Sequence, residues 1–538
     1  TAEIIVTAEA LAEEYHSQSK TTITIRPDNP YIYLVDEQIA GPGCGVEFII
    51  PSQGIAGTDK TQLVISSMRG LNINHRLQWL VRYPYGCVEQ VTSAVFPQLY
   101  LPQVYKLSLA DLQQIDVKIN AAIAAYLQYQ LASGAFSYWP NENYVNIWAN
   151  NYVGHFLLEA KAKGYHIPAG MMEKWLAYQI EAAKRNDGEA LTRAYRLYLL
   201  AQADKPVLSA MNYMRESELA HLSSPAACLL AAAYHMAGYP SVAQQILAEV
   251  ELKVEEYQEP DDTFGSALRD QALMLDVLTL VGDYTRGVDL YNAIADALSS
   301  PKWLSTQTSA YALMAVTKYV QAVQQNAPQL TGLLTLPNQG VIELETNDTV
   351  TVVPLDTTYA GQKVSYVNTA DIPVFVTLEW EGISKRGDIQ PQQSNLTLTV
   401  SYLDQAGNPV DISRVTQGAT FYVVYHVAQT GYDDINEVAL VQILPSGWEI
   451  ENLRLLGGQL PQWAYQFNLG HEEFVDIRDD HIMWFFDLDG YSSGYDFIVK
   501  INAVTQGKFY LPPTLLEAMY NNDYKVITEG QTVEVVAR

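Results

Sequence analysis

The chain has 538 residues, and its 32 lysines and arginines against 60 aspartates and glutamates give a formal net charge of −28. Such an acidic chain is not expected to bind nucleic acid or to adhere to an anionic membrane surface, and we read the acidity as a contribution to solubility. The length predicts three or four domains, with ample chain for large cores.

The cysteines form neither a disulfide framework nor a metal-binding spacing. Cys44, Cys87 and Cys228 lie far apart in the sequence, so we expect no metal and no cofactor. Cys44 and Cys228 could pair with each other. Their sequence contexts are those of separate domains, however, and we expect two buried thiols instead.

The sequence has no apolar run of transmembrane length and no signal peptide. It opens at Thr1 in what resembles the middle of a folded domain. We therefore expect a C-terminal part of a longer protein, with its targeting signals upstream of Thr1.

Residues 1–64 show a β pattern. Polar and apolar residues alternate over 21–25, and a second strand pattern over 46–50 ends at Pro51. Glycines and prolines typical of turns separate the two. The segment is too short for a complete β-sandwich, so we expect strands from elsewhere in the chain to complete it.

The stretch Tyr83-Pro84-Tyr85-Gly86-Cys87-Val88-Glu89-Gln90 carries the most chemical information. Cys87 and Gln90 are three residues apart, and on a helical turn such side chains share one face, about 5–6 Å apart at Cβ. The cysteine sulfur can then displace the amide nitrogen of the glutamine, which leaves an internal thioester open to attack by an outside amine or hydroxyl. Such a bond persists only where water is excluded. A bare C-x-x-Q pattern also fits an ordinary buried cysteine followed by a solvated Glu89–Gln90 pair.

Residues 65–325 have a helical period. Apolar residues recur at helical spacing in several segments that end near glycine or proline and return roughly every 35–45 residues, the spacing of stacked helix pairs. The clearest of these segments are 115–127, 194–200, 228–234, 272–278 and 310–316. The period alone allows either an open helical solenoid or a closed toroid of inner and outer helices.

After about residue 326 the pattern returns to strands. Segments 341–345, 349–353 and 374–380 read as strands, but 326–390 is again too short for a sandwich. We expect it to pair with 1–64, with the helical domain inserted between the two halves, because the ends of an inserted domain usually lie close together. Strand patterns continue over 391–538, which is long enough for a β-sandwich of its own.

The flanks of the Cys87–Gln90 motif resemble a known family. The run from Leu71-Asn72-Ile73 through the motif to Phe96-Pro97 is similar to the thioester region of the bacterial alpha-2-macroglobulins, which are relatives of the animal alpha-2-macroglobulins and the thioester complement proteins. The resemblance implies a Cys87–Gln90 thioester, with Gly86 and Glu89 as motif residues. Animal members usually have glycine at the position of Val88, so the resemblance is to the bacterial branch.

The resemblance also implies a multidomain α plus β fold. An α/α toroid thioester domain (65–325) would be inserted in a split CUB-like β-domain (1–64 and 326–390), and a C-terminal macroglobulin-like β-sandwich (391–538) would follow. The aromatic segment 133–140 resembles the family's next loop, although its aromatic residues by themselves indicate core packing.

Two groups of residues are expected to shield the thioester. Tyr83 and Tyr85 are rigid bulk beside the motif and can build one wall. Segment 511–523, read alone, is a proline-started loop or short helix whose Met519 and Tyr520 pack on their own sandwich. In bacterial members a Met-Tyr loop of the last domain covers the thioester, so the resemblance implies that Met519 and Tyr520 form the cover.

No catalytic residue is assigned. His155 lies on an apolar helical face beside Phe156, which is typical of a hydrogen-bonded core histidine rather than of a general base. The sequence also lacks a nucleotide-binding glycine loop, an H-E-x-x-H motif and a nucleophile-elbow serine. Without a histidine motif, we expect amine targets such as protein lysines.

The resemblance implies a single-use protease inhibitor rather than an enzyme. Cleavage of a bait region in the upstream part of the full-length protein would trigger a rearrangement, and a lysine of the target protease would attack the acyl carbon of Gln90. A periplasmic location is expected, with the full-length protein held at the inner membrane only through a lipoprotein anchor on its missing N-terminus. Two alternatives are a carbohydrate-active enzyme on an α/α toroid, which needs a pair of carboxylates in the mouth of the ring, and an adhesion scaffold of helical repeats and β-sandwiches.

Overall fold

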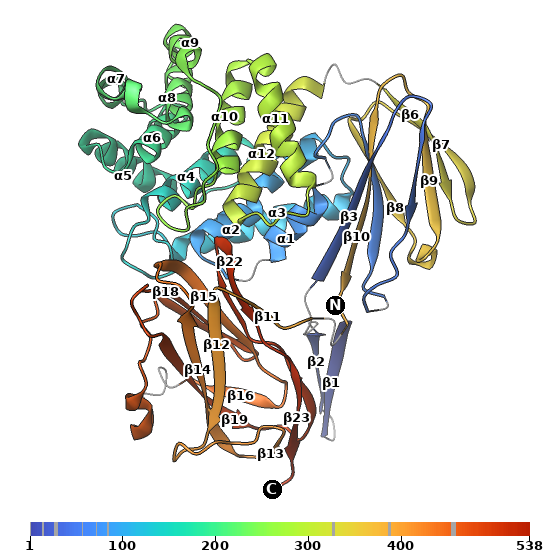
Figure 1. The fold of residues 1–538 in the computed structure, drawn as a ribbon, viewed down its shortest axis with the longest axis vertical. Helices are drawn as coiled ribbons and strands as arrows, with labels where there is room; N and C mark the ends of the chain where they lie inside the picture. Colours follow the sequence, from blue (N-terminus) through green and yellow to red (C-terminus); the bar gives the residue numbers. More distant parts are fainter. Residues whose placement is uncertain are drawn as a thin grey trace.

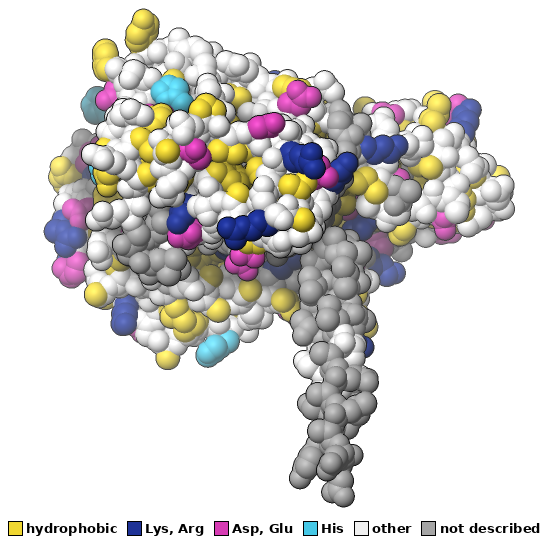
Figure 2. Space-filling view, turned by 90° about the horizontal axis from the view of Figure 1, so that it is seen from below, with side chains coloured by type: hydrophobic (Ala, Val, Ile, Leu, Met, Phe, Trp, Pro, Cys, Tyr) yellow, Lys and Arg dark blue, Asp and Glu magenta, His cyan; other side chains and the backbone are white. Residues whose placement is uncertain are grey.

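The structure is a computed structural model that describes residues 2–12, 15–25, 31–55, 57–71, 73–82, 85–324, 329–385, 389–452 and 459–538. Figure 1 shows a helical domain above the C-terminal β-sandwich, with a second sandwich beside it. Within the described residues, no helix has both the length and the apolarity needed to cross a bilayer. Figure 2 shows acidic and basic side chains interspersed on the face that it presents.

The helical domain is a closed α/α toroid, as predicted. Six inner helices contact one another in sequence, and the last contacts the first, which closes the ring. They are α2 (Val88–Val95), α4 (Ile147–Ala162), α6 (Ala190–Gln202), α8 (Ser224–Met236), α10 (Ala267–Val281) and α12 (Thr306–Val323). The outer helices are α1 (Asn74–Arg82), α3 (Leu109–Ala125), α5 (Met171–Arg185), α7 (Leu208–Ser217), α9 (Pro240–Glu249) and α11 (Tyr284–Ser299).

Composition explains which helices lie inside. Residues 225–234 of α8 are all buried, and half of them are alanines, whose small side chains let neighbouring inner helices approach closely. Outer helices bury one face only, and α3 begins with a capping box between Ser108 and Asp111. The ring therefore has an inner layer of helices that are buried on most of their surface and an outer layer of amphipathic helices.

A split β-sandwich flanks the point where the helical domain enters and leaves. One sheet has the order β3 (Tyr31–Ala40), β10 (Val374–Ile383), β5 (Lys60–Ser66) and β8 (Val350–Leu355). The other has the order β4 (Gly45–Ile49), β9 (Lys363–Asn368), β6 (Leu330–Leu336) and β7 (Gly340–Thr346). Each sheet combines strands from before and after the helices, which confirms the predicted insertion. The name CUB-like and the boundaries given above stay predictions.

The first residues do not join this sandwich. Strands β1 (Ala2–Ala12) and β2 (Tyr15–Ile25) pair with each other as a separate two-stranded sheet. Among the described residues, the first half of the split sandwich is built from 31–66 rather than from the whole of 1–64. The alternation over 21–25 does form a strand, but its partner is the preceding strand.

The C-terminal region is the predicted β-sandwich. Its largest sheet has the order β11 (Gln392–Ser394), β22 (Asn521–Ile527), β21 (Leu515–Ala518), β15 (Ile435–Ile443), β18 (His481–Leu488) and β17 (Phe474–Ile477). A second sheet has the order β12 (Leu396–Leu403), β14 (Thr420–Gln429), β19 (Tyr495–Ala503) and β16 (Trp448–Glu451). A third contains β13 (Arg414–Thr416), β23 (Gln531–Val536) and β20 (Gly507–Leu511).

Segment 511–523 differs from the loop or short helix that it suggests when read alone. Leu515–Ala518 and Asn521–Ile527 form an antiparallel hairpin, and Met519 and Tyr520 are the two residues of its turn. Pro512 and Pro513 separate it from β20, because proline cannot continue the ladder of backbone hydrogen bonds. The tip of this hairpin reaches the helical domain near α2 (Figure 1).

The cysteines are only partly as predicted. None of the three is in a disulfide, and Cys228 is buried in α8. Cys44 is exposed, which corrects the expectation of two buried thiols. The reason is local, because Cys44 closes a tight turn between β3 and β4 in which its N–H donates to the carbonyl of Gly41 (2.9 Å).

Candidate functional site

The site begins at the N-terminus of α2. Cys87 is the residue just before the helix, in an extended conformation, and its side chain is 0% exposed. Gly86 has φ +85°, a left-handed conformation that suits glycine, and it turns the chain into the helix. Tyr129 donates to the carbonyl of Gly86 (2.6 Å), and the N–H of Val88 donates to the carbonyl of Tyr138 (2.9 Å). These bonds hold the turn against the loop that follows α3.

The side-chain amide of Gln90 lies between this turn and the C-terminal sandwich. Its oxygen accepts a hydrogen bond from the backbone N–H of Gly86 (3.1 Å), and its nitrogen donates to the sulfur of Met519 (3.3 Å). Gln90 is 4% exposed. The spacing of one helical turn therefore brings Cys87 and Gln90 into one buried site, with the amide group held at both ends.

Glu89 is also buried, with an exposure of 0%. Its carboxylate accepts hydrogen bonds from Ser93 on the same helix (2.5 Å), from Thr306 on α12 (2.8 Å) and from Tyr520 (2.8 Å). Burial raises the pKa of this carboxyl, while the three hydroxyl donors oppose the shift. The alternative of a solvated Glu89–Gln90 pair is therefore wrong.

Tyr520 brings the C-terminal sandwich onto the reactive pair. Its hydroxyl lies 3.5 Å from the sulfur of Cys87 and 2.8 Å from the hydroxyl of Tyr138. Its ring packs on Phe264, with centroids 4.5 Å apart. Gln258 donates to the backbone carbonyl of Tyr520, and the N–H of Met519 donates to the carbonyl of Glu437 (2.9 Å). Met519 and Tyr520 are each 1% exposed.

Tyr85 forms another contact between the two domains. Its hydroxyl donates to Glu517 on β21 (2.6 Å), and its ring meets the ring of Phe485 edge to face at 5.6 Å. Tyr83, the other predicted wall residue, lies outside the described residues. Trp139 stacks on Phe474 (4.8 Å) and also packs on Phe485 (4.4 Å). An aromatic layer thus packs between the two domains beside the turn that carries Cys87.

The sequence did not single out several residues of the site. Tyr138 and Trp139 lie in the segment interpreted as core, and Phe264, Tyr129 and Phe485 carry no motif. The aromatic density of 136–139 was the available signal, but only the contact between distant domains shows that these rings line the site. Met519, Tyr520 and Phe485 belong to the same buried apolar cluster as the helical ring.

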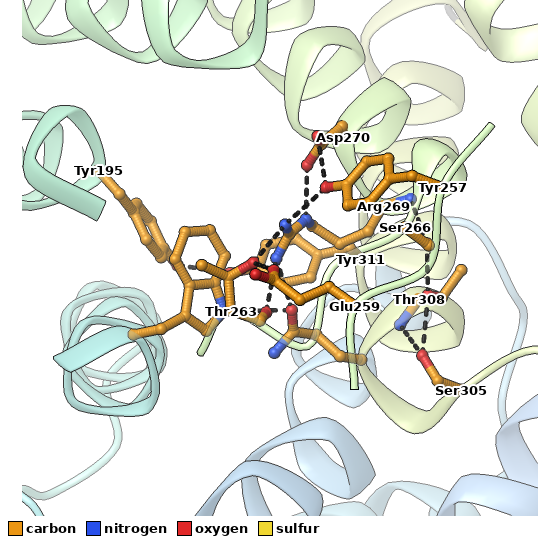
Figure 3. A network of polar contacts seen from close by, with 12 residues as sticks. Tyr195, Tyr257, Glu259, Thr263, Ser266, Arg269, Asp270, Ser305, Thr308 and Tyr311 are labelled. Atoms are coloured by element: carbon orange, nitrogen blue, oxygen red, sulfur yellow. Dashed lines mark hydrogen bonds and ion pairs between the residues drawn. The ribbon is translucent and has the colours of Figure 1, made fainter. Parts of the chain in front are cut away.

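A polar network supports the loop that holds Tyr520 in place (Figure 3). Arg269 on α10 is 0% exposed and forms an ion pair with Asp270 (2.7 Å). It also donates to the backbone carbonyl of Thr263 (2.9 Å) and to Gln307 (2.7 Å). Burial acts to lower the pKa of Arg269, but Asp270 together with Tyr257 and Tyr311 outweighs it and the pKa is raised.

The network also holds the loop that contacts Tyr520. The loop 257–266 carries Gln258 and Phe264, both of which contact Tyr520. Figure 3 shows the guanidinium group of Arg269 directed at Thr263 within this loop. A permanently charged, fully buried side chain therefore fixes the surface on which the tip of the hairpin rests.

His155 is a core residue, as its sequence setting suggests. It is 1% exposed, its Nδ1 lies 2.8 Å from the hydroxyl of Tyr195, and its ring packs edge-on against Phe96 at 4.9 Å. Burial lowers the pKa of His155. Its contacts lie with Glu159 and the inner helices, so its surroundings are those of a packing residue.

Two family models match parts of the chain. The model of the bacterial alpha-2-macroglobulin MG10 domain matches residues 396–523, and that of the A-macroglobulin TED domain matches residues 60–190. The first range contains the hairpin with Met519 and Tyr520. The second contains Cys87, Glu89 and Gln90.

Similar proteins agree with these matches. The chain is 24% identical to the alpha-2-macroglobulin of Escherichia coli (strain K12), over 91% of this chain and 31% of that protein. It is 25% identical to the alpha-2-macroglobulin of Xylella fastidiosa (strain Temecula1 / ATCC 700964), over 85% of this chain and 29% of that protein. The chain thus spans less than a third of the length of either curated relative.

Solved structures share the fold. The crystal structure of native Escherichia coli alpha-2-macroglobulin from domain MG7 to the C-terminus has a TM-score of 0.83 at 22% identity, covering 99% of this chain and 86% of that one. Salmonella alpha-2-macroglobulin reacted with methylamine also has a TM-score of 0.83 at 22% identity, covering 99% of this chain and 36% of that one. The family models, the sequence relatives and the shared fold all show that the chain is similar to the C-terminal part of the bacterial alpha-2-macroglobulins.

Proposed function

We propose that the chain traps proteases covalently through a thioester between Cys87 and Gln90. The observation that carries the proposal is the burial of both side chains, 0% and 4% exposed, beneath a turn more than 400 positions further along the chain that contacts each of them. A buried site under such a cover is what a thioester needs in order to escape hydrolysis. An ordinary core cysteine needs no such cover.

The chemistry balances without a cofactor. A bond forms between Cys87 Sγ and Gln90 Cδ, the bond from Cδ to Nε2 breaks, and ammonia leaves with the thiol proton. When the cover is displaced, an amine attacks Cδ, an amide forms and Cys87 leaves as a free thiol. The acyl group ends as a stable amide, so each chain reacts once and the protein is an inhibitor rather than an enzyme.

The proposal also includes a target, a trigger and a location for the full-length protein. The target is a protease that offers a lysine amine, and the trigger is cleavage of a bait region in an upstream part of the full-length protein. That protein would act in the periplasm, anchored at the inner membrane through its N-terminal region. The relatives named alpha-2-macroglobulin and the methylamine-reacted Salmonella structure support this chemistry for the family.

Intact-mass spectrometry tests the thioester directly. The purified chain should be lighter than its calculated mass by one ammonia. Methylamine should add its full mass and release one thiol, that of Cys87. The Cys87→Ala variant should have its calculated mass and not react. The proposal would be overturned if the wild-type chain has its full calculated mass and does not react with methylamine after mild denaturation.

A second measurement tests the target. The full-length protein is mixed with a protease that cleaves it and, in parallel, with the same protease after its lysines have been dimethylated. A denaturant-stable conjugate should form only with unmodified lysines, and it should be absent with Cys87→Ala. Equal conjugation of both protease samples would contradict lysine capture.

A further inference from the structure

The carboxylate of Glu89 lies behind the reactive pair and is held by hydroxyl groups. Ser93, Thr306 and Tyr520 each donate one hydrogen bond to it. A carboxylate whose donors are neutral can take up a proton without leaving a buried cation unpaired, in contrast to a carboxylate in a buried ion pair. Glu89 is thus suited to accept a proton within the closed site.

A line of hydrogen bonds joins the thiol of Cys87 to this carboxylate. The sulfur lies 3.5 Å from the hydroxyl of Tyr520, and that hydroxyl donates to Glu89 at 2.8 Å. A tyrosine hydroxyl has one proton, so once it donates to Glu89 its oxygen can only accept. The direction of the line is therefore from the Cys87 thiol to the Tyr520 oxygen, and from the Tyr520 proton to Glu89. The hydroxyl of Tyr138 lies 2.8 Å from the same oxygen.

The thiol needs such a path in order to react. The thiolate is the nucleophilic form of cysteine, and burial, followed by the charge of Glu89, raises the pKa of Cys87 far above its ordinary value. A free thiolate is therefore not available in the closed site at neutral pH. Attack on the amide must be coupled to removal of the thiol proton by a nearby base.

The carbonyl of Gln90 is prepared for attack from the other side. Its oxygen accepts the backbone N–H of Gly86 at 3.1 Å. Negative charge develops on this oxygen when sulfur adds to the carbonyl carbon, and a fixed N–H donor stabilises that charge most in a site without water. The Gly86 turn thus acts as an oxyanion donor in addition to its role in chain reversal.

We propose that Tyr520 and Glu89 form the proton relay that makes the thioester. As Cys87 Sγ adds to Gln90 Cδ, the thiol proton passes to the Tyr520 oxygen and the Tyr520 proton passes to Glu89. As the bond from Cδ to Nε2 breaks, the same hydroxyl returns the proton to the departing nitrogen, and ammonia leaves. Glu89 and Tyr520 end in their starting states.

The relay links thioester formation to assembly of the domains. Cys87 and Glu89 belong to the helical ring, whereas Tyr520 belongs to the C-terminal sandwich. The relay is complete only after the hairpin has docked, so the electrophile forms beneath its own cover and not before. This inference rests on the proposed thioester, and it assigns Tyr520 a chemical role beyond that of a lid.

The test compares Glu89→Gln and Tyr520→Phe with wild type. Both changes preserve shape, and the phenylalanine ring still covers the site and packs on Phe264. The controls are Glu379→Gln, a buried glutamate in β10 that accepts from Gln62 (2.6 Å), and Tyr366→Phe, a buried tyrosine in β9 whose hydroxyl donates to Thr331 (3.1 Å). Each chain is made by cell-free synthesis, and the peptide that contains Cys87 and Gln90 is followed by mass over time.

The mass of this peptide separates a relay from a shield. If the relay operates, both variants keep the glutamine amide and a free Cys87 thiol, and loss of ammonia slows by about 10²–10⁴-fold, the range of general acid–base catalysis. If Glu89 and Tyr520 only shield, the thioester forms at the wild-type rate and is then hydrolysed, which leaves glutamate at position 90. Glutamate at position 90 in both variants would overturn the inference.

Two further readouts complete the design. Glu89→Asp keeps a carboxylate and should restore part of the rate, which a purely structural role for Glu89 does not predict. If Glu89→Asp restores nothing and Glu89→Gln disrupts the fold, the result counts against the relay. The controls should lose ammonia at the wild-type rate. If wild type itself never loses ammonia, the proposed thioester fails, whereas loss at equal rates in wild type and both variants overturns only the relay.

Discussion

Two glutamates of the same helical ring, the buried Glu89 and the partly buried Glu159, have opposite kinds of hydrogen-bonding and charged partners. Glu159 on α4 lies 3.7 Å from the ammonium group of Lys318, which also contacts Asp276 at 3.0 Å. Burial acts to raise the pKa of Glu159, but Lys318 and His155 outweigh it and the pKa is strongly lowered. Glu89 has hydroxyl donors instead, and burial leaves its pKa raised.

The difference suits the two carboxylates to different roles, a structural one for Glu159 and the proposed chemical one for Glu89. The Glu159 carboxylate is held in its ionised form, because protonation would leave the partly buried Lys318 with one partner fewer. The Glu89 carboxylate can gain or lose a proton with little rearrangement. A buried charge that pairs with a cation supports the fold, and one held by hydroxyls remains available for chemistry.

The largest expected effect comes from breaking the ion-paired network. Lys318→Met leaves the partly buried carboxylates of Glu159 and Asp276 without their cation, and we expect the free energy of unfolding of the helical domain to fall by about 3–5 kcal/mol in urea denaturation. Glu89→Gln should change it by much less, because its hydroxyl donors can reorient. Lys184→Met, which removes an exposed pair with Glu181, is the control and should have a much smaller effect, because solvent screens that pair. Equal losses for Lys318→Met and Glu89→Gln would contradict the comparison.

Another buried glutamate, Glu379, should make the stability of the split sandwich depend on pH. Burial raises the pKa of Glu379 from 4.5 to about 7 in the folded state. The native state then binds more protons than the unfolded state between these values, so stability should fall as pH rises from about 4.5 to about 7 and then level off. The expected fall is on the order of 3 kcal/mol.

The Glu379→Gln variant should lose this part of the pH dependence. The measurement is the free energy of unfolding of the split sandwich at several pH values. Glu343→Gln, at an exposed position of β7 in the same domain, is the control and should keep the slope. An unchanged slope in Glu379→Gln would show that the carboxyl is not buried in the way described.

The cover should be weakened by a change that leaves the relay intact. Met519→Ala removes the sulfur that accepts from Gln90 and opens space above the thioester, so loss of the thioester to methylamine should become about tenfold faster, equivalent to about 1.4 kcal/mol in the barrier. The matched control is Met211→Ala, which truncates a buried methionine of α7 at 0% exposure. Equal reactivity of Met519→Ala and wild type would show that Met519 does not shield the thioester.

A change of similar size is expected from the loss of one donor to Glu89. Thr306→Val keeps the shape but removes a hydrogen bond to a buried carboxylate, so we expect a loss of about 1–2 kcal/mol in stability and a further rise in the pKa of Glu89. Thr317→Val in the same helix, where the hydroxyl donates to the carbonyl of Leu313, is the control and should lose less. The reverse order would argue that Glu89 is protonated in the resting state.

Much of the architecture was readable in the sequence. The switch from period two to helical period and back marks the insertion, and the sheets confirm it by pairing β5 with β8 and β10. The pairing of β1 with β2 was not foreseen, because alternation identifies a strand but not its partner. The turn at Met519 was interpreted as a loop or short helix when read alone, because prolines precede it and only its neighbours β15 and β22 define it as a hairpin.

The sequence by itself determined the reactive pair, since the spacing of Cys87 and Gln90 is a local property of one helical turn. Local spacing also determined which segments become helices and strands, because it sets which side chains share a face. Tertiary structure alone decided what surrounds the pair. Closure of the ring placed Thr306 against Glu89, and docking of the last sandwich placed Tyr520 between Cys87 and Glu89. Burial and hydrogen bonding between distant segments depend on the whole fold, and they convert a short motif into a closed site.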